Sequence, residues 1–157
     1  MSIKSKNIDL GKIFLKYLDE KQYSRLQRET EKLGELENQS PIIVFYYACS
    51  ITLNQSSNIK DLRYANNLFE RLYVNNRQDL QLLCNMIEVS FRTQEFKAVL
   101  PYVEEAYKTN QNDERLLIGL SKIHLYLANL NESIKYFKIL CKINPTKKID
   151  RGEFLTS

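Results

Sequence analysis

Residues that break helices or cross-link chains are scarce in this sequence. Its 157 residues include 4 glycines, 3 prolines and 3 cysteines, and tryptophan is missing altogether. So few glycines and prolines, in a chain that is 43% hydrophobic, argue against disorder, collagen-like repeats and a loop-rich sandwich, and they favour long helices. Cys49, Cys84 and Cys141 lie far apart without a Cys-x-x-Cys pair, so they indicate neither a disulfide framework nor a zinc site. We therefore expect reduced, buried thiols.

Long apolar runs are missing as well. No segment approaches the ~20 residues that a helix needs to span a bilayer. The first ten residues also lack the apolar core of a signal peptide. The length is typical of a single domain. We therefore expect a single-domain cytoplasmic protein with no membrane partner.

An excess of charge of one sign is absent from most of the chain. Residues 1–113 hold 15 basic and 15 acidic side chains, and the net charge of +4 arises within residues 114–157. Proteins that bind nucleic acids usually cluster Lys and Arg and have a domain pI above about 9. The intermixed charges and the pI of about 8.9 therefore argue against a nucleic-acid partner.

Residues typical of catalysis are equally few. The single histidine, His124, shares a helical stripe with Leu117 and Leu120, and no carboxylate stands three or four residues from it, so we expect a structural role. Lys142 follows Cys141, but sequence neighbours point in different directions on a helix, so no activated thiol is indicated. No glycine-rich phosphate loop or His-Glu-x-x-His motif is present. We expect no enzymatic activity, catalytic residues, cofactor or metal.

What the sequence does contain is an internal repeat of helical segments. Apolar residues recur at i, i+3, i+4 and i+7, a spacing that places them on one face of a helix. The pattern returns after 34 residues, so that Leu83 corresponds to Leu117. Small residues at one repeated position allow two helices to approach closely, and aromatic residues at another fill the space between neighbouring repeats. The small residues are Ala65, Ala106 and Ser133, and the aromatic residues are Phe69 and Phe137.

The last repeat resembles the tetratricopeptide (TPR) pattern W-x2-L-G-x2-Y, A-x3-F, P, which has a period of 34 residues. The residues at the pattern positions are Leu117, Leu120, Ser121, His124, Ser133, Phe137 and Pro145. The resemblance extends over residues 7–147, with repeats at 7–40, 41–79, 80–113 and 114–147. A polar insertion at 54–58 predicts a lengthened turn. The resemblance implies an all-α, right-handed solenoid of about four helical hairpins, followed by a tail at 148–157.

The resemblance also implies a function. TPR solenoids bind a peptide or a segment of a partner protein in a concave groove, which is lined by defined positions of the first helix in each hairpin. The corresponding residues that we select as the candidate binding site are Tyr46, Asn85, Glu88, Phe91, Arg92, Arg115, Lys122 and Tyr126. The groove that clamps chaperone C-termini is not indicated, because Gly119 stands where that clamp has an arginine. We therefore predict a non-catalytic protein-interaction module.

Two other functions remain open from the sequence. The chain could be the substrate-recruiting arm of a larger glycosyltransferase or sulfotransferase, with residues 151–157 beginning the next domain. It could also be a helical repeat that binds single-stranded RNA, although Glu88 beside Arg92 argues against the basic groove that this needs.

The C-terminal end of the predicted solenoid raises a separate question. Terminal repeats need a polar outer face, and the stretch after Pro145 is too short for a stable capping helix. Ile134, Phe137, Leu140 and Cys141 would then be only partly covered. Three explanations follow: the chain belongs to a longer protein, it forms a homo-oligomer through this uncapped repeat, or its tail folds back.

Overall fold

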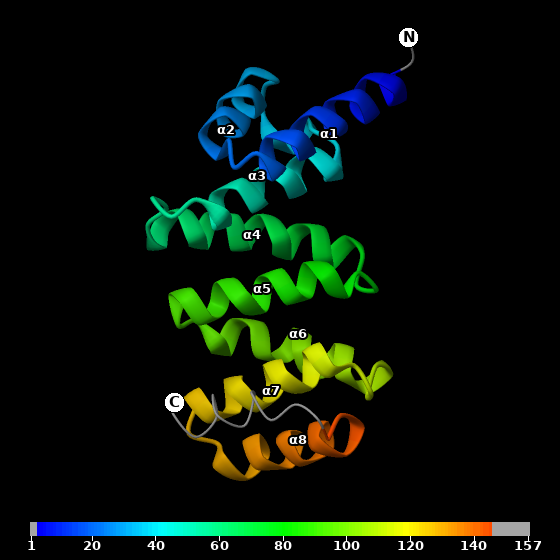
Figure 1. The fold of residues 1–157 in the computed structure, drawn as a ribbon, viewed down its shortest axis with the longest axis vertical. Coiled ribbons are helices and arrows are strands. Elements are labelled where there is room, and N and C mark those ends of the chain that lie inside the picture. The colour runs from blue at the N-terminus through cyan, green and yellow to red at the C-terminus, as the bar shows by residue number, and fades with distance from the viewer. Residues whose placement is uncertain (1–2, 146–157) are drawn as a thin grey trace. The chain divides into compact units, whose positions relative to one another are not determined.

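The computed structural model describes the backbone of residues 3–145 and the side chains of residues 10–145, so the predicted tail at 148–157 lies outside the described residues. Every element in this range is helical, which confirms the predicted all-α fold (Figure 1). The elements are α1 (Ile3–Asp19), α2 (Tyr23–Lys32), the 3-10 helix η1 (Leu36–Asn38), α3 (Pro41–Leu53), α4 (Ile59–Asn75), α5 (Leu80–Thr93), α6 (Phe96–Thr109), α7 (Glu114–Tyr126) and α8 (Leu130–Ile143). They form two compact units, Met1–Asn76 and Arg77–Ser157.

In the N-terminal unit, α1, α2 and α3 share a core, although Ile13, which has the same helical spacing on α1, is exposed. Phe14 packs with Leu26 of α2 and Ile43 of α3, and all three side chains are almost fully buried. Tyr46, one of the predicted groove residues, packs against this cluster from α3. The insertion at 54–58 forms the turn before α4, where the Asn58 side chain accepts a hydrogen bond from the backbone N–H of Asp61 in a capping box. Polar side chains stabilise this longer turn, because they form hydrogen bonds with backbone groups that lie outside the helices.

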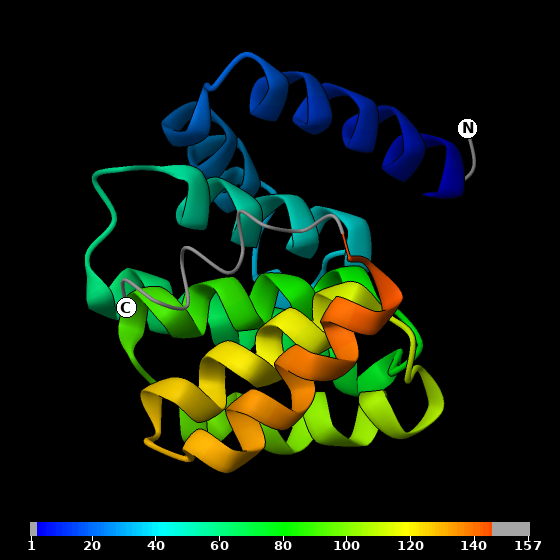
Figure 2. The ribbon, with the colours of Figure 1, turned by 60° about the horizontal axis from the view of Figure 1, so that its bottom comes forward.

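In the C-terminal unit, α5 with α6 and α7 with α8 form two hairpins. Figure 2 shows α7 and α8 lying side by side along most of their length. Ser133 is small enough to let the two helices approach closely. Its buried hydroxyl also donates a 2.7 Å hydrogen bond to the backbone carbonyl of Ser121 on α7. Ala65 and Ala106 are also buried, so the predicted role of the small residues is supported at all three positions.

Two details of the packing differ from the expectations. Phe69 is fully buried and Phe137 on α8 is half-buried, as predicted, but Leu140, which was expected to be only partly covered, is almost fully buried against α7. The three cysteines are free, and each is half-buried rather than buried. Phe69 contacts Phe45 of α3 within its own hairpin, whereas Phe137 on α8 is partly exposed.

The helix ends repeat with the same 34-residue period as the apolar residues. Asp79 and Asp113 are the N-caps of α5 and α7. Gln94 and Ala128 both adopt the left-handed conformation in the turns that follow these helices, with φ of 62° each. Three asparagines, Asn76, Asn110 and Asn144, are the C-caps of α4, α6 and α8. The repeat is thus encoded in polar end residues as well as in the core.

Candidate interaction groove

A pocket of about 290 Å³ lies between α5 and α7 in the C-terminal unit. We call it the α5–α7 groove. Its lining residues are Cys84, Ile87, Glu88 and Phe91 from α5, and Arg115, Ile118, Gly119 and Lys122 from α7. Successive α5 residues are separated by three, one and three positions, which places them on one helical face. The groove therefore combines an apolar floor with a charged rim.

Gly119 sets the distance between the two helices that form the groove. A Cβ atom at this position would lie 3.2 Å from Cδ1 of Ile87, a contact tighter than side chains normally make. Both residues are buried, so neither has free space into which it can shift. Glycine is unfavourable in the middle of a helix, and its presence here is explained by the close approach of α7 to α5.

This contact can be tested with a double-mutant cycle. Gly119→Ala adds helix propensity but also a tight contact, whereas Ile87→Val removes the Cδ1 atom that the new methyl group would meet. We expect Gly119→Ala to be more favourable by about 1 kcal/mol in the Ile87→Val background than in the wild-type protein. Urea unfolding of the four proteins gives the coupling directly. Additivity within about 0.3 kcal/mol would show that the two side-chain positions do not meet.

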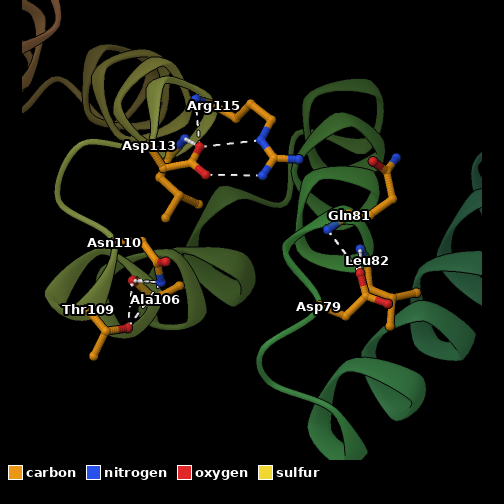
Figure 3. A network of polar contacts seen from close by, with 9 residues as sticks. Asp79, Gln81, Leu82, Ala106, Thr109, Asn110, Asp113 and Arg115 are labelled. Atoms are coloured by element: carbon orange, nitrogen blue, oxygen red, sulfur yellow. Dashed lines mark hydrogen bonds and ion pairs between the residues drawn. The ribbon is translucent and has the colours of Figure 1, made fainter. Parts of the chain in front are cut away.

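The rim of the groove carries charges of both signs. Glu88 is exposed on α5, while Arg115 and Lys122 lie along α7. The Arg115 guanidinium is held by the Asp113 carboxylate, with Nη2 3.0 Å from Oδ2 and Nε 3.3 Å from Oδ1 (Figure 3). The same carboxylate caps α7 by accepting hydrogen bonds from the backbone N–H groups of Arg115 and Leu116. The capping residue thus fixes a cation at one end of the groove.

These contacts also set the protonation of Asp113. Burial of the carboxyl by itself would raise its pKa, but the hydrogen bonds from the Arg115 side chain and from the backbone of Leu116 and Arg115 outweigh this effect. The net result is a pKa below the usual 3.8. Because the folded protein binds this proton more weakly than the unfolded chain, the carboxylate stabilises the fold above the unfolded pKa. That contribution is lost as the pH falls through the folded pKa.

We therefore expect the stability difference between the wild-type protein and Asp113→Asn to depend on pH. Asparagine caps a helix as well as aspartate does, so the variant removes mainly the charge. The wild-type advantage, about 1 kcal/mol at pH 6, should shrink steadily between about pH 5 and about pH 2. Chemical unfolding at a series of pH values measures it. In an Arg115→Gln background, the advantage of Asp113 over asparagine should be smaller at every pH. An advantage that grows as the pH falls would contradict the lowered pKa of Asp113.

The thiols of Cys84 and Cys49, one in each unit, are not activated. Burial raises the pKa of the Cys84 thiol, and the nearby Arg115 lowers it only in part. On α3, burial raises the pKa of Cys49 to about 12. Since the thiolate is the reactive form, both groups are neutral and weakly nucleophilic at neutral pH. Cys84 thus contributes to the groove as a small apolar side chain.

An aromatic cluster forms one end of the groove. Phe91 lies 5.2 Å from Phe96 and 5.7 Å from Tyr126, measured between ring centroids. Phe96 and Tyr126 are stacked at 5.0 Å with an angle of 14° between their planes. Phe96 is buried, whereas Tyr126 is exposed. The cluster therefore offers a rigid aromatic surface whose outer ring faces solvent.

The structure brings together some of the predicted site residues and separates others. Glu88, Phe91, Arg115 and Lys122 line the α5–α7 groove, and Tyr126 contacts it through Phe91.

Three predicted site residues do not line the groove. Asn85 is half-buried on α5, and its Nδ2 has no hydrogen-bond partner among the described residues. Arg92 is exposed at the end of α5, and Tyr46 belongs to the N-terminal unit. Sequence reasoning did not select Ile87 or Phe96 for the site, because neither holds a groove position of the TPR pattern.

His124 is buried as predicted, and a carboxylate approaches it from another helix rather than from its own. Its Nε2 is 3.8 Å from a carboxylate oxygen of Glu104, which comes from α6 rather than from its own hairpin. The Nδ1 atom lies 3.2 Å from the side-chain nitrogen of Asn129, and the ring stacks on Tyr136. Sequence spacing within one helix could not reveal a partner from another helix. These contacts hold the imidazole inside the packing of α6, α7 and α8.

Two wider features of the described residues complete this picture. Among residues 3–145, no helix is both long and apolar enough to cross a bilayer. Among residues 10–145, whose side chains the structure describes, no three His, Cys, Asp or Glu side chains are grouped so that they could hold a metal ion.

The hairpins, their period and their caps define a class: this is a helical repeat protein with a TPR-like fold. MamA structures share this fold. MamA from Desulfovibrio magneticus RS-1, from residue 41 to its end, superposes with a TM-score of 0.72 at 15% identity over 89% of this chain and 76% of that chain. MamA structures designated AMB-1 and MSR-1 give TM-scores of 0.70 and 0.69 at 12% identity, over 90% and 89% of this chain and 75% and 78% of theirs. No protein-family model matches the sequence, and a search of curated proteins finds no match.

Proposed function

We propose that the protein is a non-catalytic interaction module that binds a segment of a partner protein in the α5–α7 groove. The observation that carries this proposal is the groove itself, a cavity with an apolar floor, a rim of both charges and an aromatic end. Protein-binding sites of this kind place apolar and aromatic anchors in pockets and use polar groups at the rim for orientation. The TPR-like fold supports the proposal, since helical hairpins present such surfaces.

The groove has a defined chemical preference. Ile87, Ile118 and Gly119 form a floor suited to one large apolar side chain of the partner segment. Glu88 lies on the α5 wall and Lys122 on the α7 wall, so a segment with a basic residue on one side of its anchor and an acidic residue on the other is oriented in one direction. The partner is therefore a segment with a central apolar anchor between opposite charges.

Selection from a peptide library on the intact protein tests this function. We expect the selected peptides to share a large apolar residue and to lose binding to Ile118→Asp, which places a charge on the groove floor. Ile59→Asp, at an exposed position of α4, is the matched control and should bind as the wild-type protein does. Thermal melting of both variants confirms that they are folded. Peptides that bind Ile118→Asp and the wild-type protein equally well would overturn the proposal.

A further inference from the structure

The outward face of α8 carries an apolar stripe that is separate from the α5–α7 groove. Leu130 is 56% exposed and Ile134 is 50% exposed, and the half-buried Phe137 and Cys141 continue the same face. These residues follow one another at spacings of four, three and four positions, which is the spacing of a coiled-coil seam. The buried Ser133 and Leu140, on the side of α8 that packs on α7, border this stripe along one edge. Leu130 and Ile134 thus expose apolar surface beside the half-buried Phe137 and Cys141.

The charges beside this stripe are of one sign. Lys138 follows Ile134 by four positions and Lys142 follows Lys138 by four, so both exposed lysines run along the same edge of the stripe. In helix pairs, residues that flank the apolar seam select the partner by charge. The edge therefore favours acidic residues on an incoming helix.

We propose that this face of α8 docks an acidic amphipathic helix of a partner protein. Apolar residues of that helix pack between Leu130, Ile134 and Phe137, and its Glu or Asp side chains pair with Lys138 and Lys142. The proposal concerns a second surface and does not depend on the function of the α5–α7 groove.

Charge argues against a second copy of the chain as the occupant. At the other end of the described chain, α1 exposes Ile13 and Leu15, but Lys16 stands three positions after the first and Lys12 three positions before the second. Stacking of α1 on α8, or of α8 on another α8, would therefore bring lysines against lysines. The sequence at 146–157, with three basic and two acidic residues, offers no net negative charge either.

Two synthetic helices of about four heptads test the proposal by fluorescence anisotropy with the full chain. Both have a leucine seam, and one carries Glu and the other Lys at the flanking positions. We expect the Glu helix to bind at least about tenfold more tightly, with a preference that weakens as salt is raised. Equal affinity for the two helices would overturn the proposal.

Variants locate the surface. The double variant Lys138→Glu with Lys142→Glu should reverse the preference between the two helices, a result that a loss of stability cannot produce. Ile134→Ser should weaken binding of the Glu helix by about tenfold, whereas the matched control Val74→Ser, at a position on α4 that is 43% exposed, should not. Ile118→Asp in the groove should also leave this binding unchanged. Binding that is insensitive to Ile134→Ser would overturn the proposal.

Two further measurements distinguish the other occupants. A dimer seen by sedimentation equilibrium that Ile134→Ser dissociates would assign the face to a second copy. Binding of the Glu helix that appears only when Phe154 and Leu155 are replaced by serine would assign the face to the end of this chain. Either result would contradict an acidic partner helix.

Discussion

Truncation of Phe69 to alanine is expected to lower the free energy of unfolding by about 3–5 kcal/mol. The side chain is fully buried on α4, and its ring meets the edge of Phe45 from α3 at a centroid distance of 6.0 Å. Removing the ring forfeits its burial and leaves a cavity that the two helices cannot close. Urea unfolding followed by far-ultraviolet circular dichroism measures the loss.

The same helix supplies the control for this prediction. Tyr64 is 47% exposed on α4, and Tyr64→Ala should cost less than about 1 kcal/mol. Phe137→Ala, at a half-buried position of α8, should fall between the two. A cost below about 1 kcal/mol for Phe69→Ala would mean that the ring does not fill the space between α3 and α4. The denaturant dependence should be compared among the variants, because a chain with two compact units can depart from two-state unfolding.

Replacing Phe91 with alanine should weaken binding of a groove-selected peptide by about 2 kcal/mol, or roughly 30-fold. Phe91 belongs both to the groove and to the aromatic cluster with Phe96 and Tyr126. Its loss therefore removes an apolar contact surface and also frees Tyr126 from one of the rings that hold it. Isothermal titration of the peptide into the wild-type and variant proteins gives the change in affinity.

A half-buried aromatic residue also contributes to stability, so the binding experiment needs two controls. Phe91→Leu keeps much of the apolar surface and should restore part of the affinity. Tyr64→Ala removes an aromatic residue from the N-terminal unit and should bind the peptide as the wild-type protein does. Melting curves identify any variant that is unfolded at the temperature of the titration. Unchanged affinity of a folded Phe91→Ala variant would show that the peptide binds elsewhere.

The helices could be predicted from the sequence because their apolar residues recur with helical spacing, and most of these residues are buried. On α1, the i, i+3, i+4 and i+7 pattern identifies Phe14 at the core, and the 34-residue period identifies Phe69 and the small residues. These features depend on spacing within one helix or on its repetition, and both are visible in a single sequence. The residues Glu88, Phe91, Arg115 and Lys122 were selected through the groove positions that the TPR resemblance implies. All four line the α5–α7 groove, and their role in binding stays a prediction.

Features that depend on contacts between helices could not be predicted in this way. Glu104 reaches His124 from a different hairpin, and the closeness of Gly119 to Ile87 depends on the distance between α5 and α7. The engagement of Arg115 by Asp113 is local, but it became apparent only once Asp113 was placed as the α7 cap. Period and composition locate a side chain on its helix, whereas its partner is set by tertiary packing.

The regular spacing of the helix caps bears on how the length of such a chain can change. The stretch from Asn76 to Asn110, and the next one to Asn144, each contain a complete hairpin together with the polar residues that satisfy its ends. Tandem duplication of one such stretch adds a hairpin whose ends are already capped. An addition of another length inside a helix shifts the caps away from the backbone groups that they serve. The insertion at 54–58 lies in the turn between α3 and α4. Extra residues at this place do not change the spacing of buried residues within either helix.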